Sequence, residues 1–236
     1  MSSNIAIELI NISKKYRIRS TKHNTLREHL SSFFSREEDK EENEFWALKN
    51  INIKISKGEC IGIYGPNGSG KTTILKLIAN VTKPTEGQLI INGKVAPLIS
   101  VSAGFHPDLN GRENILTNGT IIGMSINEIR EKEDEIIKFS GLKNDFLSMP
   151  IKKYSSGMIT RLGFSIAAHS SAEIILLDEI LAVGDEKFQK KCISKLKELK
   201  KIKTIVVVSH NKPLMEEIVD KIYLMGQKEF ISVNKD

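Results

Sequence analysis

The sequence has no apolar stretch long enough to cross a membrane. Its longest uninterrupted apolar runs, 174–177 and 205–208, have the length of strands, whereas a spanning helix needs about 20 apolar residues. The N-terminus shows no basic segment followed by an apolar core, so no secretory signal is expected. Any work at a membrane is therefore expected to depend on a partner that spans it.

Cysteine and tryptophan are also scarce. The two cysteines, Cys60 and Cys192, lie far apart and lack the spacing of metal ligands. We interpret them as reduced thiols, buried or half-buried, in a cytosolic protein. The chain has a single tryptophan, 40% hydrophobic residues and 27% charged residues over 236 positions. This composition favours one α/β domain over residues 1–236 rather than a disordered or fibrous chain.

Basic residues outnumber acidic ones, which gives a net charge of +6. Such an excess can serve nucleic acid or anionic lipid. In the lysine-rich run 187–203, however, apolar residues recur at spacings of three and four: Phe188, Cys192, Leu196, Leu199 and Ile202. The pattern predicts an amphipathic helix whose lysines form its solvated face. We therefore do not expect nucleic acid as a partner.

Strand and helix patterns alternate along the chain. Strands are predicted at 6–12, 51–55, 60–64, 88–92, 174–178, 204–209 and 221–225, with a helix over 213–220. Between about 95 and 170 the pattern is mainly helical. In the segment 20–45, a short helix is predicted over 25–34, followed by an exposed acidic loop over 36–44. Alternation of this kind predicts a parallel sheet covered by helices.

Residues 65–72 match the phosphate-binding pattern G-x-x-x-x-G-K-[ST] at every fixed position. An apolar strand precedes the match and a helix pattern follows it, which argues against a chance glycine loop. Glycines let backbone N–H groups point at phosphate oxygens, Lys71 supplies a charge for the phosphates, and the Thr72 hydroxyl can bind Mg²⁺. The candidate nucleotide-binding residues here are Gly65, Pro66, Asn67, Gly68, Ser69, Gly70, Lys71, Thr72 and Thr73.

An acidic pair ends the buried-looking strand 174–178. Asp178 is placed to contact Mg²⁺ or a water bound to it, and Glu179 can act as general base toward the attacking water. On its own, an acidic pair at a strand end is as often an ordinary surface feature as part of a functional site. Downstream of a phosphate-binding loop, the two carboxylates predict a catalytic centre for phosphoryl transfer to water.

A third element, Tyr154-Ser155-Ser156-Gly157-Met158, lies between the loop and the acidic strand. Ser155 has the pattern of a helix N-cap, and the free N–H groups behind it can bind phosphate. In this order and spacing the chain resembles ABC ATPases, whose Leu-Ser-Gly-Gly-Gln motif contacts ATP held by the other subunit of a dimer. The resemblance spans residues 5–226. It implies a P-loop NTPase fold with a RecA-like core, a helical subdomain at about 96–170 and an N-terminal antiparallel β region.

The resemblance also assigns roles to single residues. Tyr16 falls where the family has an aromatic that stacks on adenine, although a lone tyrosine is otherwise usually core. Gly184-Asp185 resembles a loop that lines the dimer interface. His210 resembles the histidine that binds the γ-phosphate, whereas elsewhere a histidine after a strand is a structural residue. Ser155, Ser156 and Gly157 are implied to close on the partner's ATP, so the implied cofactors are ATP and Mg²⁺ and the implied assembly is a homodimer.

Two differences from the usual family pattern point to a subgroup of the family. The motif reads Tyr-Ser-Ser-Gly-Met, and no glutamine occurs between Lys94 and Asn110, where the family has one; Ser100 or Ser102 are candidates for part of its role. Both features resemble the ATP-binding subunits of bacterial exporters for O-antigen, capsule or teichoic acid. The segment 20–45 is similar to a gate-like helix in that subgroup. A C-terminal carbohydrate-binding domain, which some members carry, is not expected.

The resemblance implies a peripheral subunit on the cytoplasmic face of the inner (plasma) membrane. It is expected to bind two copies of a permease near the segment 95–125 and to drive a lipid-linked polysaccharide through that permease. Alternatives are an ABC ATPase for another cargo, a soluble ABC ATPase acting on DNA or ribosomes, and a non-catalytic regulatory subunit. Intact Lys71, Asp178, Glu179 and His210 argue against the last.

Overall fold

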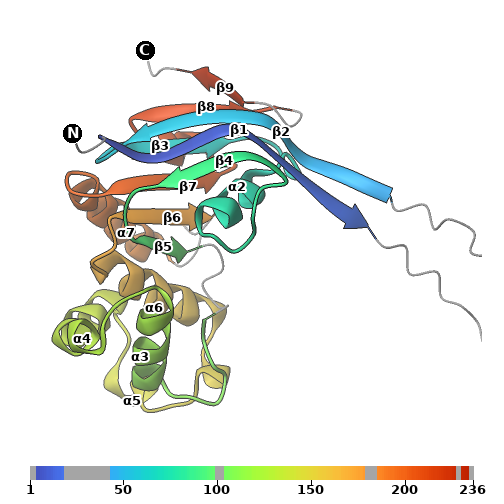
Figure 1. Ribbon diagram of the computed structural model, residues 1–236. Coiled ribbons are helices and arrows are strands. Elements are labelled where there is room, and N and C mark those ends of the chain that lie inside the picture. Colours follow the sequence, from blue (N-terminus) through green and yellow to red (C-terminus); the bar gives the residue numbers. More distant parts are fainter. Residues whose placement is uncertain (1–3, 19–42, 99–103, 179–184, 227–229, 234–236) are drawn as a thin grey trace, which may run out of the picture.

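The computed structural model describes residues 4–18, 43–98, 104–178, 185–226 and 230–233. Figure 1 shows three layers: an antiparallel sheet, a mostly parallel sheet beneath it, and a group of helices at the far end. The predicted α/β architecture with an N-terminal antiparallel region is thus confirmed. Of the predicted segment 20–45, nearly all lies outside the described residues, including the helix expected at 25–34.

The antiparallel sheet has the strand order β2-β1-β4. Its strands are β1 (Ile5–Ile18), β2 (Asn43–Ser56) and β4 (Glu86–Ile91). The strands β1 and β2 run well beyond the predicted 6–12 and 51–55, because register shifts let the ladder continue past irregular points. Glu44, which was predicted to lie in an acidic loop, belongs to β2 and pairs with Lys15 at 2.7 Å.

The second sheet has the order β5-β6-β7-β3-β8-β9. Its parallel strands are β3 (Cys60–Tyr64), β5 (Val95–Leu98), β6 (Ile174–Asp178), β7 (Thr204–Ser209) and β8 (Lys221–Met225). The strand β9 (Phe230–Val233) adds an antiparallel edge. Successive residues of β6 and β7 alternate between two apolar clusters on opposite faces. Covered on both sides, these strands read as continuous apolar runs.

Two strands were not predicted. The strand β5 lies at the start of the region that reads as helical, so the expectation of helix from 95 or 96 is wrong for its first residues. It contains Pro97, which a sheet tolerates at an edge, and β5 is an edge strand beside β6. Similarly, β9 pairs only with β8 and is four residues long.

Helices surround the parallel sheet in two groups. The helix α2 (Lys71–Ile78) packs between the two sheets, while α7 (Glu186–Leu199) and α8 (Lys212–Glu216) cover the other face. The helical end seen at the bottom of Figure 1 comprises α3 (Gly111–Ile121), α4 (Ile126–Ser140), α5 (Asn144–Leu147), the 3₁₀ turn η1 (Ile151–Lys153) and α6 (Ser156–His169). The helix α8 is shorter than the predicted 213–220.

The amphipathic helix expected over the lysine-rich run is α7, whose Phe188, Cys192, Leu196 and Leu199 are buried. Ile202 is an exception, because it lies beyond the helix and is 77% exposed. Several lysines have partners rather than only solvent. Lys191 donates to the carbonyl of Phe139 at 2.8 Å, and Lys200 pairs with Asp220 at 2.7 Å.

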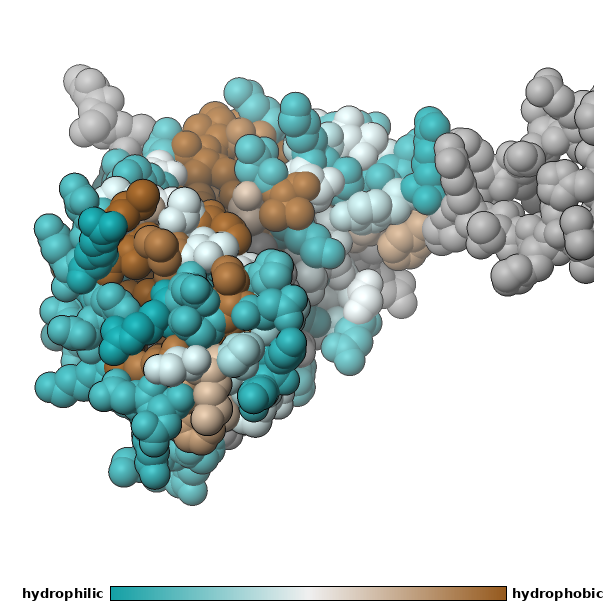
Figure 2. Space-filling model, turned by 90° about the horizontal axis from the view of Figure 1, so that it is seen from below, coloured by the Kyte–Doolittle hydropathy of each residue, from teal (hydrophilic) through white to brown (hydrophobic). Residues whose placement is uncertain are grey.

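The surface of the helical end carries apolar side chains among charged ones, as the view from below in Figure 2 shows. The exposed large apolar residues in this region are Leu116, Ile121, Ile126, Phe146 and Met149. None of the helices in the described ranges combines the length and the apolar character that a bilayer span requires.

Candidate nucleotide site

The loop between β3 and α2 curls as the glycine pattern predicts. Gly68 and Gly70 have φ angles of +77° and +104°, a region that side chains disfavour. A Cβ on Gly70 would approach the carbonyl oxygen of Ala47 to 2.7 Å and the methyl carbon of Met225 to 2.8 Å. Glycine is therefore required at position 70 for two reasons: the positive φ angle and the lack of room for a Cβ.

Lys71, the first residue of α2, is only 6% exposed. Its Nζ donates to the carbonyl oxygens of Gly65 at 2.7 Å and Pro66 at 2.8 Å. These bonds hold the ammonium over the loop whose N–H groups are expected to bind phosphate. The positive end of an eight-residue helix lies at the same point, which adds to the attraction for an anion.

Ser69 supplies a test of whether this loop fits a ligand. Among the described residues its Oγ is the one buried side-chain oxygen or nitrogen without a hydrogen-bond partner. A buried hydroxyl left without a partner costs about 1–3 kcal/mol, so such atoms usually mark a site that a ligand, ion or water completes. An orphan hydroxyl inside a glycine loop beside a lysine fits a phosphate group.

The loop forms one wall of a hollow of about 610 Å³. This volume is large enough for a nucleotide-sized ligand. Residues from four separate parts of the chain line it: Tyr16, Phe45, Ala47, Asn67, Gly68, Gly70, Lys71, Thr72, Thr73 and Asp178. The structure thus brings together the phosphate loop, the acidic strand and the aromatic of β1, as expected from the sequence.

Asp178 reaches the hollow because β6 ends there. In the sheet, β7 separates β6 from β3, and α2 packs against β6, so the carboxyl ends of these strands face the start of α2. Asp178 and the Thr72 hydroxyl line the same hollow, and oxygen atoms of this kind are the ligands that Mg²⁺ prefers. No group of three or more His, Cys, Asp or Glu in the described part of the chain suits a metal. One carboxylate and one hydroxyl instead fit Mg²⁺ that is bound mainly through phosphates and water.

Glu179, Gly184, Ser100 and Ser102 lie outside the described residues, so their predicted roles stay predictions. His210 follows β7 directly and is exposed, at the same edge of the sheet as Asp178, but it does not line the hollow. Asp185 caps α7 by accepting from the Phe188 N–H at 2.8 Å. It also lies 3.8 Å from the guanidinium of Arg161 in α6, so its contacts within the single chain are structural.

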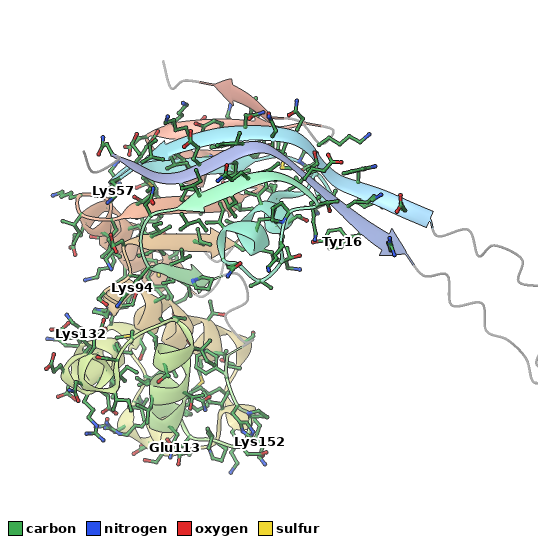
Figure 3. All side chains as sticks on the ribbon, viewed as in Figure 1. Tyr16, Lys57, Lys94, Glu113, Lys132 and Lys152 are labelled. Carbon is green, nitrogen blue, oxygen red and sulfur yellow. The ribbon has the colours of Figure 1, made fainter. Side chains whose placement is uncertain are left out.

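Two aromatic rings line the hollow. Tyr16 and Phe45 are opposite each other in the β1–β2 ladder, which puts their side chains next to each other on one face. They are 37% and 41% exposed, unusually high for aromatic residues, and both line the hollow. Figure 3 shows Tyr16 at the end of the sheets where α2 lies, opposite the end that carries Lys57 and Lys94.

Sequence reasoning missed Phe45 and Ala47 as lining residues. Phe45 lies at the site because it pairs with Tyr16 across two strands. These strands are separated in the chain by the segment 19–42, so the sequence alone does not show the pairing. The signal that the sequence did hold was a second exposed-strand aromatic, Phe45 beside Trp46, close to the phosphate loop in the fold but not in the chain.

The motif Ser155-Ser156-Gly157 is not part of this hollow. Ser155 caps α6 as predicted, with its Oγ accepting from the Met158 N–H at 3.3 Å. Ser155 and Ser156 are exposed, and they belong to the helical end rather than to the layer between the sheets. Within one chain, the two predicted phosphate-binding elements are therefore separate.

Comparison with known sequences gives consistent relatives. Residues 48–182 match the profile of a family described as ABC transporter. The O-antigen export system ATP-binding protein RfbB of Myxococcus xanthus is 51% identical over 175 residues, which are 74% of this chain and 40% of that protein. The Klebsiella pneumoniae protein of the same name is 44% identical over 75% of this chain and 72% of its own length.

A third relative covers more of the chain. The teichoic acids export ATP-binding protein TagH of Shouchella clausii is 41% identical over 94% of this chain and 60% of its own length. The chain therefore spans 40% to 72% of the length of these relatives. Among solved structures, a dimeric post-hydrolysis state of the ATP-binding cassette MJ0796 with ADP and Pi matches with a TM-score of 0.77 and 25% identity, over 97% of this chain and 98% of that one.

Proposed function

This chain belongs to the ABC transporter family, and on that premise we propose that it hydrolyses ATP to drive export of a lipid-linked cell-surface polysaccharide. The observation that carries the proposal is the hollow in which Lys71, Thr72 and Asp178 meet two exposed aromatic rings. Three contributions meet there: positive charge with a glycine loop, oxygen ligands, and flat apolar surfaces. Together they suit a nucleoside triphosphate.

Each group has a distinct task in this proposal. The loop 65–70 and Lys71 bind the phosphates, and Tyr16 with Phe45 stacks on the base. Thr72 and Asp178 hold Mg²⁺, which neutralises charge on the phosphates when bound. Glu179 orients and deprotonates the attacking water, and His210 with Lys71 stabilises the negative charge that develops on the transferred phosphoryl oxygens.

We further propose that two copies of the chain complete each other's sites. The hollow is open at one side, and the capped end of α6, with Ser155, Ser156 and Gly157, lies elsewhere in the same chain. Backbone N–H groups at this helix end, in a 14-residue helix, suit a phosphate that their own chain cannot offer. The solved relative MJ0796 is described as dimeric, which supports a head-to-tail pair with two ATP molecules between the chains.

The cargo and the membrane partner follow from the relatives. Proteins named for O-antigen export and teichoic acids export are 36% to 51% identical to this chain. We propose a peripheral subunit on the cytoplasmic face of the plasma membrane, bound to two copies of a permease that handles the glycan. Leu116 and Ile121, exposed apolar residues within the segment 95–125, support docking of the permease there.

The positive net charge gives little support to a nucleic-acid function. Five of the eight lysines between positions 187 and 203 donate hydrogen bonds to carbonyl oxygens or carboxylates: Lys190, Lys191, Lys197, Lys200 and Lys203. Lysines already bound within the fold contribute less to a phosphate-binding surface than free ones. The alternative, export of another cargo, uses the same ATP chemistry. Only the glycan composition of the cell envelope distinguishes the two functions.

Hydrolysis and cargo are tested with one matched set of variants. Glu179→Gln is expected to bind ATP as the parent does and to lose turnover at least about 100-fold, as for removal of a general base. In cells, deletion of the gene is expected to remove the surface glycan, with restoration by the parent gene but not by the Glu179→Gln form. Full turnover by the variant would refute the role of Glu179, and an unchanged envelope glycan after deletion would refute the cargo.

A further inference from the structure

Tyr154 is the residue directly before the cap of α6, and its side chain is almost entirely inside the protein. It is 8% exposed, and burial raises the pKa of its hydroxyl. The hydroxyl donates to the backbone carbonyl of Phe146, the third residue of α5, at 2.6 Å. The rings of Tyr154 and Phe146 also meet edge to face, with centroids 6.5 Å apart. The start of α6 is thus tied to α5 by one short hydrogen bond and one ring contact.

The same hydroxyl fills a space that a glycine leaves open. A Cβ on Gly111, the first residue of α3, would overlap the Tyr154 oxygen and would come within 3.1 Å of the Leu147 Cα. Gly111 has no positive φ angle, so the turn does not require a glycine here. The requirement comes from the close approach of α3, α5 and Tyr154, which meet at this one point.

A second set of bonds joins the same place to the loop before α3. The Ile151 N–H donates to the carbonyl of Leu109 at 2.9 Å, and the Lys152 N–H donates to that of Pro107 at 3.0 Å. Lys152 also pairs with Asp108 at 2.9 Å. The loop 106–110 and the turn 150–153 are therefore joined by backbone and side-chain bonds, and the turn continues directly into Tyr154 and Ser155.

The loop itself is held from inside by Asn114 of α3, whose side chain is fully buried. Its amide oxygen accepts from the His106 N–H at 2.7 Å. Its amide nitrogen donates to the carbonyls of His106, Leu109 and Asn110 at 2.9–3.1 Å. Loop, α3 and turn are consequently one hydrogen-bonded unit, and Tyr154 is its connection to the capped end of α6.

We propose that Tyr154 is a positioning residue, which holds Ser155 and Gly157 in the orientation needed to close on the nucleotide of a second copy of the chain. The inference rests on the proposed function, since it concerns how two copies close. Tyr154 lines no part of the nucleotide hollow of its own chain. Its hydroxyl therefore affects closure of the pair and leaves binding of ATP to the single chain unchanged.

The substitution Tyr154→Phe removes the hydroxyl and keeps the ring. One neutral hydrogen bond has a net worth that corresponds to about a two- to tenfold change in an equilibrium constant. We expect the protein concentration at half-dimerisation, with saturating Mg·ATP, to rise by that factor or more. The affinity of the monomer for a fluorescent ATP analogue, measured at low protein concentration, is expected to stay within twofold, roughly the resolution of such a comparison.

The experiment uses the full chain with Glu179→Gln as parent, so that hydrolysis does not reopen the pair, and sedimentation velocity as readout. Tyr223→Phe is the matched control, because it removes the hydroxyl of another tyrosine, 6% exposed on β8, which belongs to the apolar cluster between the sheets and not to the cluster that contains α6. It is expected to dimerise like the parent. Any change seen only with Tyr154→Phe is then specific to that position.

Gly111→Ala provides an independent arm. Alone, its Cβ displaces the Tyr154 hydroxyl and is expected to weaken dimerisation as well. In the double variant with Tyr154→Phe, the overlapping hydroxyl is absent. The loss of dimer affinity in the double variant is therefore expected to be smaller than the product of the losses in the two single variants. Full additivity of the two changes would contradict a shared contact and overturn the inference.

The remaining outcomes are separable. If the parent dimerises and Tyr154→Phe dimerises equally well, the inference fails while the proposed function stands. If Tyr154→Phe weakens ATP binding to the monomer as much as it weakens dimerisation, its role is general stability and the inference is also overturned. If the parent itself stays monomeric with saturating Mg·ATP, the proposed function fails and the inference fails with it.

Discussion

At the scale of single residues, the sharpest constraint lies at Gly70. Gly70 and Gly58 both have positive φ angles, +104° and +78°. They differ in their surroundings, because a Cβ at position 58 meets no atom within 4 Å while one at position 70 meets Ala47, Leu48 and Met225. Backbone strain is thus common to both positions, and steric overlap is specific to one.

We expect Gly58→Ala to lower the free energy of unfolding by about 1 kcal/mol, the usual cost of a left-handed alanine. Gly70→Ala is expected to cost about 3 kcal/mol or more, because overpacking adds to that strain. Urea denaturation without nucleotide measures both. Equal losses in the two variants would show that the space around position 70 is not limiting.

The two thiols give a second residue-scale prediction. Both are buried, and burial raises the pKa of Cys192 from 9.0 to about 12. At pH 8 this thiol is therefore protonated as well as covered, and alkylation by iodoacetamide is expected to be slow in the folded chain and fast in urea. Rapid labelling of Cys192 in the folded protein, located by mass spectrometry, would contradict its placement on the inner face of α7.

The same shift has a consequence for stability. Between pH 9.0 and about 12 the thiol ionises in the unfolded chain but stays protonated in the folded one. The unfolded state then binds fewer protons, so the contribution of Cys192 to stability is complete below pH 9 and falls as the pH rises through this window. Cys192→Ala is expected to lose this component of the alkaline decline.

At the scale of elements, the join between the helical end and the parallel sheet depends on Lys203. Its Nζ donates to the carbonyls of Ser170 and Ala172, the latter at 2.7 Å, in the turn between α6 and β6. From the other side, Glu128 of α4 accepts from the Ser171 N–H at 2.6 Å. A single short turn is thus held by charged groups from two different elements.

Lys203→Met is expected to lower the free energy of unfolding by about 2 kcal/mol, since it removes a charged donor and leaves carbonyls without their partner. Lys201→Met, an exposed lysine two residues away, is the control and is expected to change it by less than about 0.5 kcal/mol. The difference between their urea midpoints checks the prediction. Indistinguishable midpoints would mean that this lysine is not part of the join.

Elements also show what the sequence can and cannot predict. The strands β3, β6 and β7 and the helices α2 and α7 were predictable because each carries its own apolar pattern and punctuation. The strand β5 was not, since four residues with a proline become a strand only beside β6. Phe45 and Tyr154 depend on partners distant in the chain, Tyr16 and Phe146. The phosphate loop was predictable from its motif, whereas the pair of aromatic rings depends on long-range strand pairing.

At the scale of the whole molecule, the hollow and the capped end of α6 are each incomplete. The hollow has a phosphate loop, a carboxylate and two rings but an open side, and α6 presents N–H groups outside it. In the proposed assembly, a second copy placed head to tail supplies what each lacks. Assembly driven by ATP is therefore the central claim, because the catalytic, coupling and positioning roles all depend on it.

The mass and nucleotide content of the Glu179→Gln protein, with and without saturating Mg·ATP, test that claim most directly. Multi-angle light scattering gives the mass, and denaturation followed by chromatography gives the bound nucleotide. Without ATP we expect a mass near the 26.4 kDa of one chain. With ATP we expect twice that mass and one ATP per chain. A protein that binds ATP yet stays at the mass of one chain would contradict the account.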